Sequence, residues 1–161
     1  MKPAQPRELD WSWERSPGWR GQMDRVQRWR QRLSEAAGSS NTEATFDIAL
    51  TFFINCYHLR DWLERSGEVP DAALVELFRN STSLRICADL ANIAKHYDLT
   101  REPRMTRQLS LAREYADPGT GWFGSDAHLR VLSDGNVRDV LELSLSCETA
   151  WLSFLRERSL I

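Results

Sequence analysis

The sequence predicts a mainly α-helical fold: a four-helix-type bundle, with one additional short helix and a β-hairpin inserted before the last helix. Apolar residues recur at helical spacing through four long segments. Gly, Pro and capping residues separate these segments. From about residue 105 to 133, apolar and polar residues instead alternate, as they do in a strand. A chain of 161 residues, 42% of them hydrophobic, is long enough to bury one core.

The first half of the chain is expected to form three helices. The first covers residues 20 to 36 and carries an apolar side and a separate arginine stripe. The second runs from about Thr42 to Ser66, before the natural stop at Gly67, and its wide apolar arc is typical of a central helix. A short helix begins at Pro70 and reaches about Phe78.

The second half is expected to hold the remaining elements. Another long helix ends near Tyr97, and an antiparallel hairpin occupies about 105–133. The turn Ser133–Asp134–Gly135–Asn136 is predicted to cap the final helix, which runs from about Val137 to Arg156. Residues 20–161 are therefore expected to be a single domain, preceded by an N-terminal arm rich in Trp and Pro at residues 1–19.

The composition limits the classes of function. The net charge of −2 gives no global basic field toward nucleic acid or membrane, and no apolar run is long enough to span a bilayer. We expect a cytoplasmic protein without a secretory signal. Cys56, Cys87 and Cys147 are far apart in sequence, and we interpret them as small buried hydrophobes in a reducing compartment. The arm either packs on its own domain or docks a partner.

A line of polar residues follows one stripe of the helix that ends near Tyr97. Arg85, Asp89, Asn92 and His96 stand at i, i+4, i+7 and i+11, apart from the apolar face of the same helix. Glu148 lies within the apolar arc of the last helix. A buried acid needs a cation, and the sequence suggests Arg85 or His96.

Three interpretations of this polar line stay open. In the first, the line and Glu148 form a hydrogen-bonded network that fixes helix register. In the second, His96 is a general acid/base oriented by Asp89 or Glu148, and cationic and polar neighbours hold an anionic substrate. Those neighbours are Arg85, Asn92, Lys95, His58 and Asp61. In the third, His58, Asp61, Asp89 and His96 bind a metal, but the Glu-x-x-His pair of ferritin-type sites is missing. We therefore expect neither metal nor cofactor.

Two short motifs carry a resemblance to a known family. CYHLRDWL (56–63) followed by DLANIAKH (89–96), with a Trp-bearing last helix, is similar to a group of small bacterial proteins that resemble outlying members of the HEPN superfamily of helical bundles. The similarity covers roughly residues 44 to 158. It implies bacterial stress, toxin–antitoxin or phage-defence settings, frequent homodimers, and often RNA cleavage. The ribonuclease signature, Arg followed after four to six residues by His, is absent, and many family members without it serve as binding modules.

A basic stripe on the first helix is the remaining candidate site. Arg25, Arg28 and Arg32 stand at i, i+3 and i+7 beside Trp29, a pattern able to follow a phosphate backbone and stack a base. We therefore expect an HEPN-like binding or regulatory module with a protein partner, possible nucleic-acid binding and no membrane. The alternatives are a nucleic-acid- or nucleotide-directed hydrolase using His96 and a structural subunit of a larger assembly.

Overall fold

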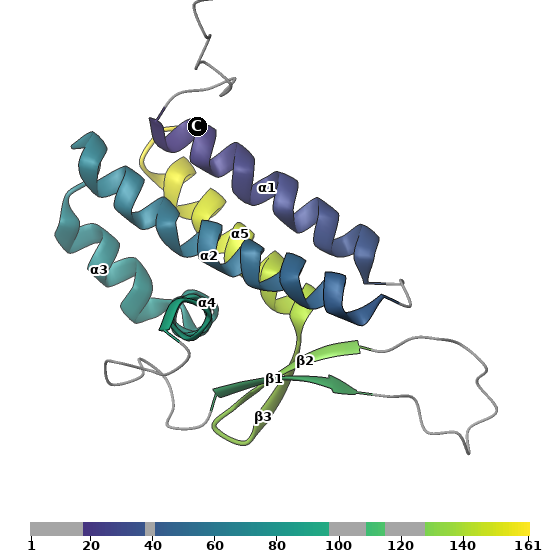
Figure 1. The fold of residues 1–161 in the computed structure, drawn as a ribbon. Helices are drawn as coiled ribbons and strands as arrows, with labels where there is room; N and C mark the ends of the chain where they lie inside the picture. Colours follow the sequence, from purple (N-terminus) through teal and green to yellow (C-terminus); the bar gives the residue numbers. More distant parts are fainter. Residues whose placement is uncertain (1–17, 38–40, 97–108, 115–127) are drawn as a thin grey trace, which may run out of the picture.

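A computed structural model describes residues 18–37, 41–96, 109–114 and 128–161 (Figure 1). Over these ranges the chain is mainly helical, with a small antiparallel sheet before the last helix, which confirms the predicted fold class. The elements, in order, are α1 (Gly18–Ala36), α2 (Thr42–Ser66), α3 (Asp71–Asn80), α4 (Thr82–His96), β1 (Leu109–Glu114), β2 (His128–Ser133), β3 (Asn136–Asp139) and α5 (Val140–Glu157).

Local sequence signals set the ends of α2 and the start of α3. The Asn41 side chain accepts a hydrogen bond from the Ala44 backbone N–H at 3.1 Å, which caps α2. The helix ends at Gly67, whose φ of +72° is the left-handed conformation that glycine adopts without steric cost. Pro70 then occupies the N-cap position of α3. These boundaries agree with the sequence prediction to within two residues.

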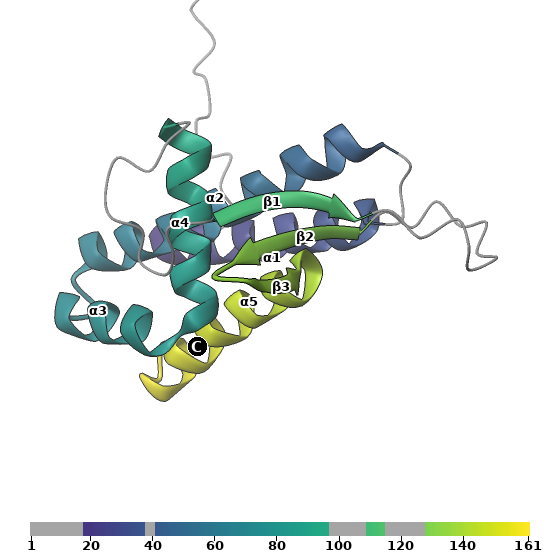
Figure 2. The ribbon, with the colours of Figure 1, turned by 90° about the horizontal axis from the view of Figure 1, so that it is seen from below.

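The helices pack around α2. It contacts α1, α4 and α5, and the three helices α1, α2 and α5 lie side by side (Figure 1). Helix α4 crosses this group steeply, because it is seen end-on in Figure 1 and lengthwise in Figure 2. The wide apolar arc of α2 is explained by this position, since neighbours cover it on several sides.

Aromatic side chains join three of the helices inside the core. Tyr57 of α2, Phe78 of α3 and Trp151 and Phe154 of α5 form a chain of edge-to-face contacts, with successive ring centroids 5.9, 5.8 and 6.1 Å apart. The Trp151 side chain is fully buried, and its indole N–H donates to the Cys56 carbonyl oxygen at 3.2 Å. Trp151 therefore combines a large buried area with a satisfied polar atom.

Within the described ranges the sheet has three strands, where the sequence predicted a hairpin. Its order is β1-β2-β3, with both pairs antiparallel. Leu129, Val131 and Ser133 on β2 are buried, while the residues between them are more exposed, which is the predicted alternation. The turn at Asp134–Gly135 joins β2 to β3 and does not start the last helix, so that part of the prediction is wrong. Residues 105–108 of the predicted first strand lie outside the described residues.

Helix α5 begins at Val140, three residues later than predicted. The Asp139 side chain caps it by accepting hydrogen bonds from the N–H groups of Leu141 (2.8 Å) and Glu142 (3.2 Å). Asp139 also forms an ion pair with Arg130 of β2 at 3.1 Å. The Asp139 side chain therefore contacts both strand β2 and the first turn of α5.

The first turn of α1 contacts the C-terminal segment of the chain. Helix α1 already includes Gly18 and Trp19, so it starts before the predicted arm boundary at residue 19. Trp19 is 2% exposed and donates to Glu68 at 2.8 Å, and the Arg20 guanidinium donates to the Leu160 carbonyl at 3.4 Å. The rest of the arm lies outside the described residues. Within the described ranges, no helix combines the length and apolar character that crossing a membrane requires.

Candidate functional site

An ion pair joins the first and last helices. Glu148 of α5 is 6% exposed, as its apolar surroundings in the sequence predicted, and its carboxylate pairs with the Arg30 guanidinium of α1. The cation is therefore Arg30, where the sequence suggested Arg85 or His96. Helix packing explains this correction, because α5 contacts α1 as well as α4. A charge pair at this depth is costly to break.

The polar line on α4 is only partly assembled. Arg85 is half-buried and donates to Thr82 Oγ1 at 3.1 Å, in place of the predicted bond to Asp89. Asp89 is 1% exposed and takes part in a polar interaction, and Asn92 is half-buried. The side chains of Lys95 and His96 lie outside the described residues. The acid/base hypothesis for His96 thus stays a prediction, with Glu148 engaged by α1.

The histidine–aspartate pair of α2 does not join Asp89. His58 is exposed on α2, and Asp61 is half-buried, whereas Asp89 is deep in the core. The possible ligand atoms of these three residues do not form a metal-binding group. The described members of the alternative metal set therefore do not converge.

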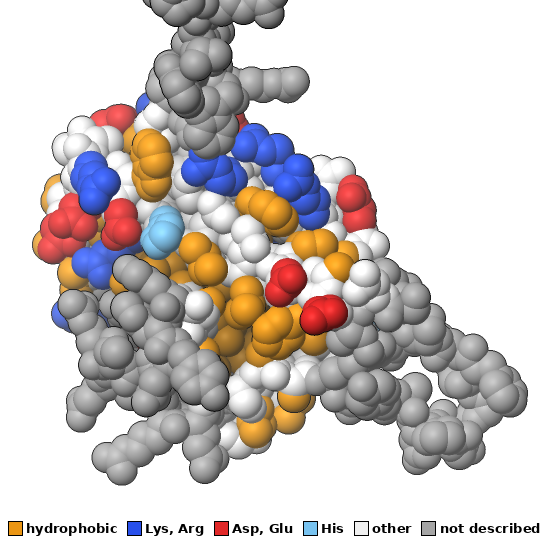
Figure 3. Space-filling model, viewed as in Figure 1, with side chains coloured by type: hydrophobic (Ala, Val, Ile, Leu, Met, Phe, Trp, Pro, Cys, Tyr) orange, Lys and Arg blue, Asp and Glu red, His pale blue; other side chains and the backbone are white. Residues whose placement is uncertain are grey.

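The basic stripe of α1 keeps two of its three arginines at the surface. Arg25 is half-buried, and its guanidinium donates a hydrogen bond to the Gln22 side chain of the same helix at 2.5 Å. Arg28 and Arg32 are exposed, and neither forms an ion pair with a described residue. Figure 3 shows Lys and Arg side chains gathered over α1. We call Arg28, Trp29 and Arg32 the α1 face.

A hollow adjoins this face. The half-buried Trp29 ring lies beneath the Arg32 guanidinium, whose central carbon is 4.6 Å from the ring centroid. Both residues line a hollow of about 550 Å³ between α1 and the beginning of α2, together with residues that include Glu35, Asn41 and Ile48. A second hollow of about 370 Å³ lies between α3 and α5. Neither hollow is lined by Arg85, Asp89 or Asn92.

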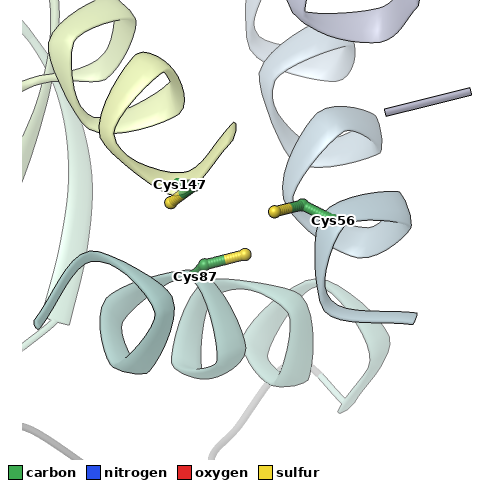
Figure 4. Close-up of side chains that lie close together, drawn as sticks. All are labelled: Cys56, Cys87 and Cys147. Atoms are coloured by element: carbon green, nitrogen blue, oxygen red, sulfur yellow. The ribbon is translucent and has the colours of Figure 1, made fainter. Parts of the chain in front are cut away.

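The three cysteines meet in the core. Cys56 comes from α2, Cys87 from α4 and Cys147 from α5, all are fully buried, and their sulfur atoms lie within 4.8 Å of one another. Figure 4 shows the three side chains pointing toward a common centre. All three are free thiols. Cys87 Sγ lies 3.4 Å from the Phe53 carbonyl oxygen, and Cys147 Sγ lies 3.4 Å from that of Ser83. We call these residues the cysteine triad.

The three thiols of the triad differ in pKa. Burial is the largest single influence and raises the pKa of Cys56, but hydrogen bonds with the Cys147, Cys87 and Trp151 side chains together outweigh it and lower the pKa to about 5. Burial raises the pKa of Cys87 and of Cys147 well above the ordinary value, and their interactions with Cys56 reinforce this direction. The physical reason is that the Cys147, Cys87 and Trp151 side chains stabilise a thiolate on Cys56, and that charge disfavours a second thiolate on Cys87 or Cys147.

The sequence correctly predicts that the cysteines lie in the buried core, but it does not predict their convergence. Their separations of 31 and 60 residues resemble no ligand motif. The available signal was that each occupies an apolar arc of a different core helix. That pattern predicts burial, and only the packing of α2, α4 and α5 decides whether the sulfurs meet.

No protein-family model, no curated protein and no solved structure matches this chain.

Proposed function

We propose that the protein is a binding module and that its α1 face binds single-stranded RNA. The observation that carries this proposal is that Trp29 and Arg32 line one hollow and that Arg28, the neighbour of Trp29 in sequence, is exposed. The guanidinium groups of Arg28 and Arg32 have no ion-pair partner among the described residues, so they can contact phosphate.

The charge of α1 supports a polyanion as the ligand. This helix carries five arginines and two acidic residues, although the whole chain has a net charge of −2. A local excess of arginine attracts phosphate within about one Debye length, which is roughly 8 Å at physiological salt. Arg30 is occupied by Glu148, so the contacts to RNA fall on Arg28 and Arg32.

The indole of Trp29 supports a single strand over a duplex. Bases of a single strand can leave the stack and pack on an aromatic ring, and each such contact contributes about 1–3 kcal/mol. Duplex RNA keeps its bases stacked inside the helix and presents mainly phosphates and 2′-hydroxyls. The hollow beside Trp29 has the volume for one flat base.

Residues 44–158 resemble a group of small bacterial proteins that in turn resemble outlying HEPN members, and this resemblance suggests the biological setting. The family is associated with bacterial stress, toxin–antitoxin and phage-defence settings, and many of its members without the ribonuclease signature serve as binding modules. We accordingly propose a regulatory role without cleavage, in which a protein partner or a second copy accompanies the RNA.

The proposal is tested by fluorescence anisotropy with a labelled oligouridine over a range of salt concentrations. For the intact chain, we expect binding at low salt that weakens steeply as salt is added. The double variant Arg28→Gln/Arg32→Gln should bind more weakly, and its salt slope should fall by about 0.7 for each phosphate that is no longer neutralised. Trp29→Ala should weaken binding while leaving the salt slope unchanged.

A matched control removes the same amount of charge elsewhere. Arg65→Gln/Arg79→Gln changes two exposed arginines at the ends of α2 and α3. This variant should bind like the wild type. If the wild type does not bind at low salt, or if both double variants lose affinity equally, the α1 face is not an RNA site.

A further inference from the structure

The cysteine triad has the geometry of a metal site built from three helices. Sulfur atoms that lie within 4.8 Å of one another fit inside a circle of radius about 2.8 Å, and a Zn–S bond is about 2.3 Å long. Each sulfur therefore needs to move by only about 0.5 Å to bind a central ion. Such shifts are within the reach of a cysteine χ1 adjustment, without a change in the helix backbone.

The chemistry of the donor set selects the kind of ion. Three thiolates are soft ligands, which favour thiophilic ions over Mg²⁺ or Ca²⁺. A divalent ion with three thiolates has a net charge of −1, whereas a monovalent ion would leave −2 in a fully buried site. Because the cost of burying charge rises steeply with its amount, the divalent ion fits better.

We propose that Cys56, Cys87 and Cys147 bind one divalent thiophilic metal ion of the Zn²⁺ type. On binding, the S–H bonds of the protonated thiols break, their protons leave to solvent, and each sulfur donates an electron pair to the ion. There is no change in oxidation state, so no oxidant or reductant is required. The ion ties α2, α4 and α5 together at the centre of the bundle.

The burial of the triad points to a structural role. All three sulfur-bearing residues are fully buried, and none of them lines either hollow. Catalytic zinc sites keep a position open for water or substrate, whereas structural sites are usually closed by four protein ligands, of which the triad supplies three. The ion therefore enters while the chain folds, and its binding free energy adds to the free energy of unfolding. This site shares no residue with the α1 face.

Substituting the cysteines would have different effects if they only filled space in the hydrophobic core. If the three thiols only fill space, alanine at one position removes a single sulfur atom from the packing and has no effect on metal content. A metal site instead loses one of three ligands, and the remaining two no longer hold the ion at this depth. Metal content therefore separates the two interpretations where stability alone does not.

The experiment refolds the full chain in a phosphine reductant with Zn²⁺, removes unbound metal by gel filtration, and measures zinc by elemental mass spectrometry. We expect close to one zinc per chain and a melting temperature above that of chain refolded with a chelator. Refolding with Cd²⁺ should produce thiolate-to-metal charge-transfer absorption with the intensity of three thiolates. Wild-type protein that retains no metal, or that binds Cd²⁺ without this absorption, would overturn the proposal.

Single-cysteine variants test whether the ion binds at the triad. Cys56→Ala, Cys87→Ala and Cys147→Ala should each lose the zinc, with circular dichroism used to confirm that the variant remains helical. The control is His58→Ala/His128→Ala, which removes two exposed histidines able to bind zinc at the surface. This control should retain the zinc. Loss of zinc in the histidine control, with retention in the folded cysteine variants, would assign the metal to the surface and overturn the proposal.

Discussion

The Arg30 guanidinium of α1 and the Glu148 carboxylate of α5 form an ion pair at the edge of the core, with the acid only 6% exposed. The arginine side chain is partly exposed and the glutamate side chain is almost covered. The pair therefore fixes how the first helix lies against the last.

Replacing Arg30 with Ala should lower the free energy of unfolding by about 1–3 kcal/mol, because Glu148 stays buried without its cation. The measurement is urea unfolding near neutral pH, followed by circular dichroism. Arg28→Ala on the same helix is the control, since Arg28 is exposed, and its effect should stay within about 0.5 kcal/mol. Equal losses in the two variants would show that the pair contributes no stability of its own.

Removing both members of the pair gives a second readout. The double variant Arg30→Met/Glu148→Leu should be more stable than Arg30→Ala, because no charge remains buried without a partner. A double variant less stable than Arg30→Ala would show that the pair contributes more than mutual charge compensation.

Trp151→Ala should lower the free energy of unfolding by about 3–5 kcal/mol, because Trp151 is the largest fully buried side chain among the described residues and its loss breaks the contacts to Phe78 and Phe154. Chemical unfolding measures this loss. Trp62→Ala is the control, since Trp62 is 37% exposed, and it should cost about 1 kcal/mol or less. Similar losses at the two positions would contradict the central role of Trp151.

Asp139 combines a helix cap with an ion pair, and two substitutions separate these contributions. Asp139→Ala should lower the free energy of unfolding by about 1–2 kcal/mol, because two N–H groups of α5 lose their acceptor. Asp139→Asn keeps a capping oxygen and loses only the charge facing Arg130 and His128, so it should cost no more than about 1 kcal/mol. Thermal or urea unfolding compares the two variants. A larger loss for Asn than for Ala would contradict the capping role.

The low pKa of Cys56 predicts a pH dependence in the metal-free protein. Its pKa falls from an ordinary value of 9.0 to about 5 in the folded chain, so one thiolate per chain should be present at neutral pH. Ultraviolet thiolate absorption measures this charge, and Cys56→Ala should abolish it. Cys87→Ala should raise the titration midpoint, because it removes a hydrogen-bond donor to the thiolate.

The same shift has a defined effect on stability. A depressed pKa in the folded state contributes stability that is present above the unfolded value of about 9 and is lost as the pH falls through about 5. The stability of metal-free wild type relative to Cys56→Ala should therefore decrease from pH 8 to pH 5. A difference that stays constant over this range would show that Cys56 is protonated at neutral pH.

The fold was largely predictable from local sequence. Helix periodicity, Asn41 and Gly67 placed α2, and the alternation of Leu129 and Val131 placed β2. Strand β3 was missed because Asn136–Asp139 is short and mostly exposed, so no apolar alternation distinguishes it from a turn before the helix. Its pairing with β2, which defines it as a strand, is a contact between chain segments.

The candidate sites were less predictable. The burial of Glu148 followed from its apolar neighbours, and the exposure of Arg28 and Arg32 followed from their place on a polar stripe. The partner of Glu148 could not be predicted, because the local sequence does not distinguish Arg30 on α1 from Arg85 on α4 as the cation. Only the contact between α1 and α5 selects Arg30.

By itself, the sequence determined where the helices begin and end and which of their faces are apolar, because capping and periodicity depend on residues within one or two turns of each other. The tertiary structure alone decided that Arg30 meets Glu148 and that Cys56, Cys87 and Cys147 share one centre. Those meetings depend on how α1 and α4 cross the other helices. Crossing angles and helix rotations arise from the packing of all the side chains together, so no single segment encodes them.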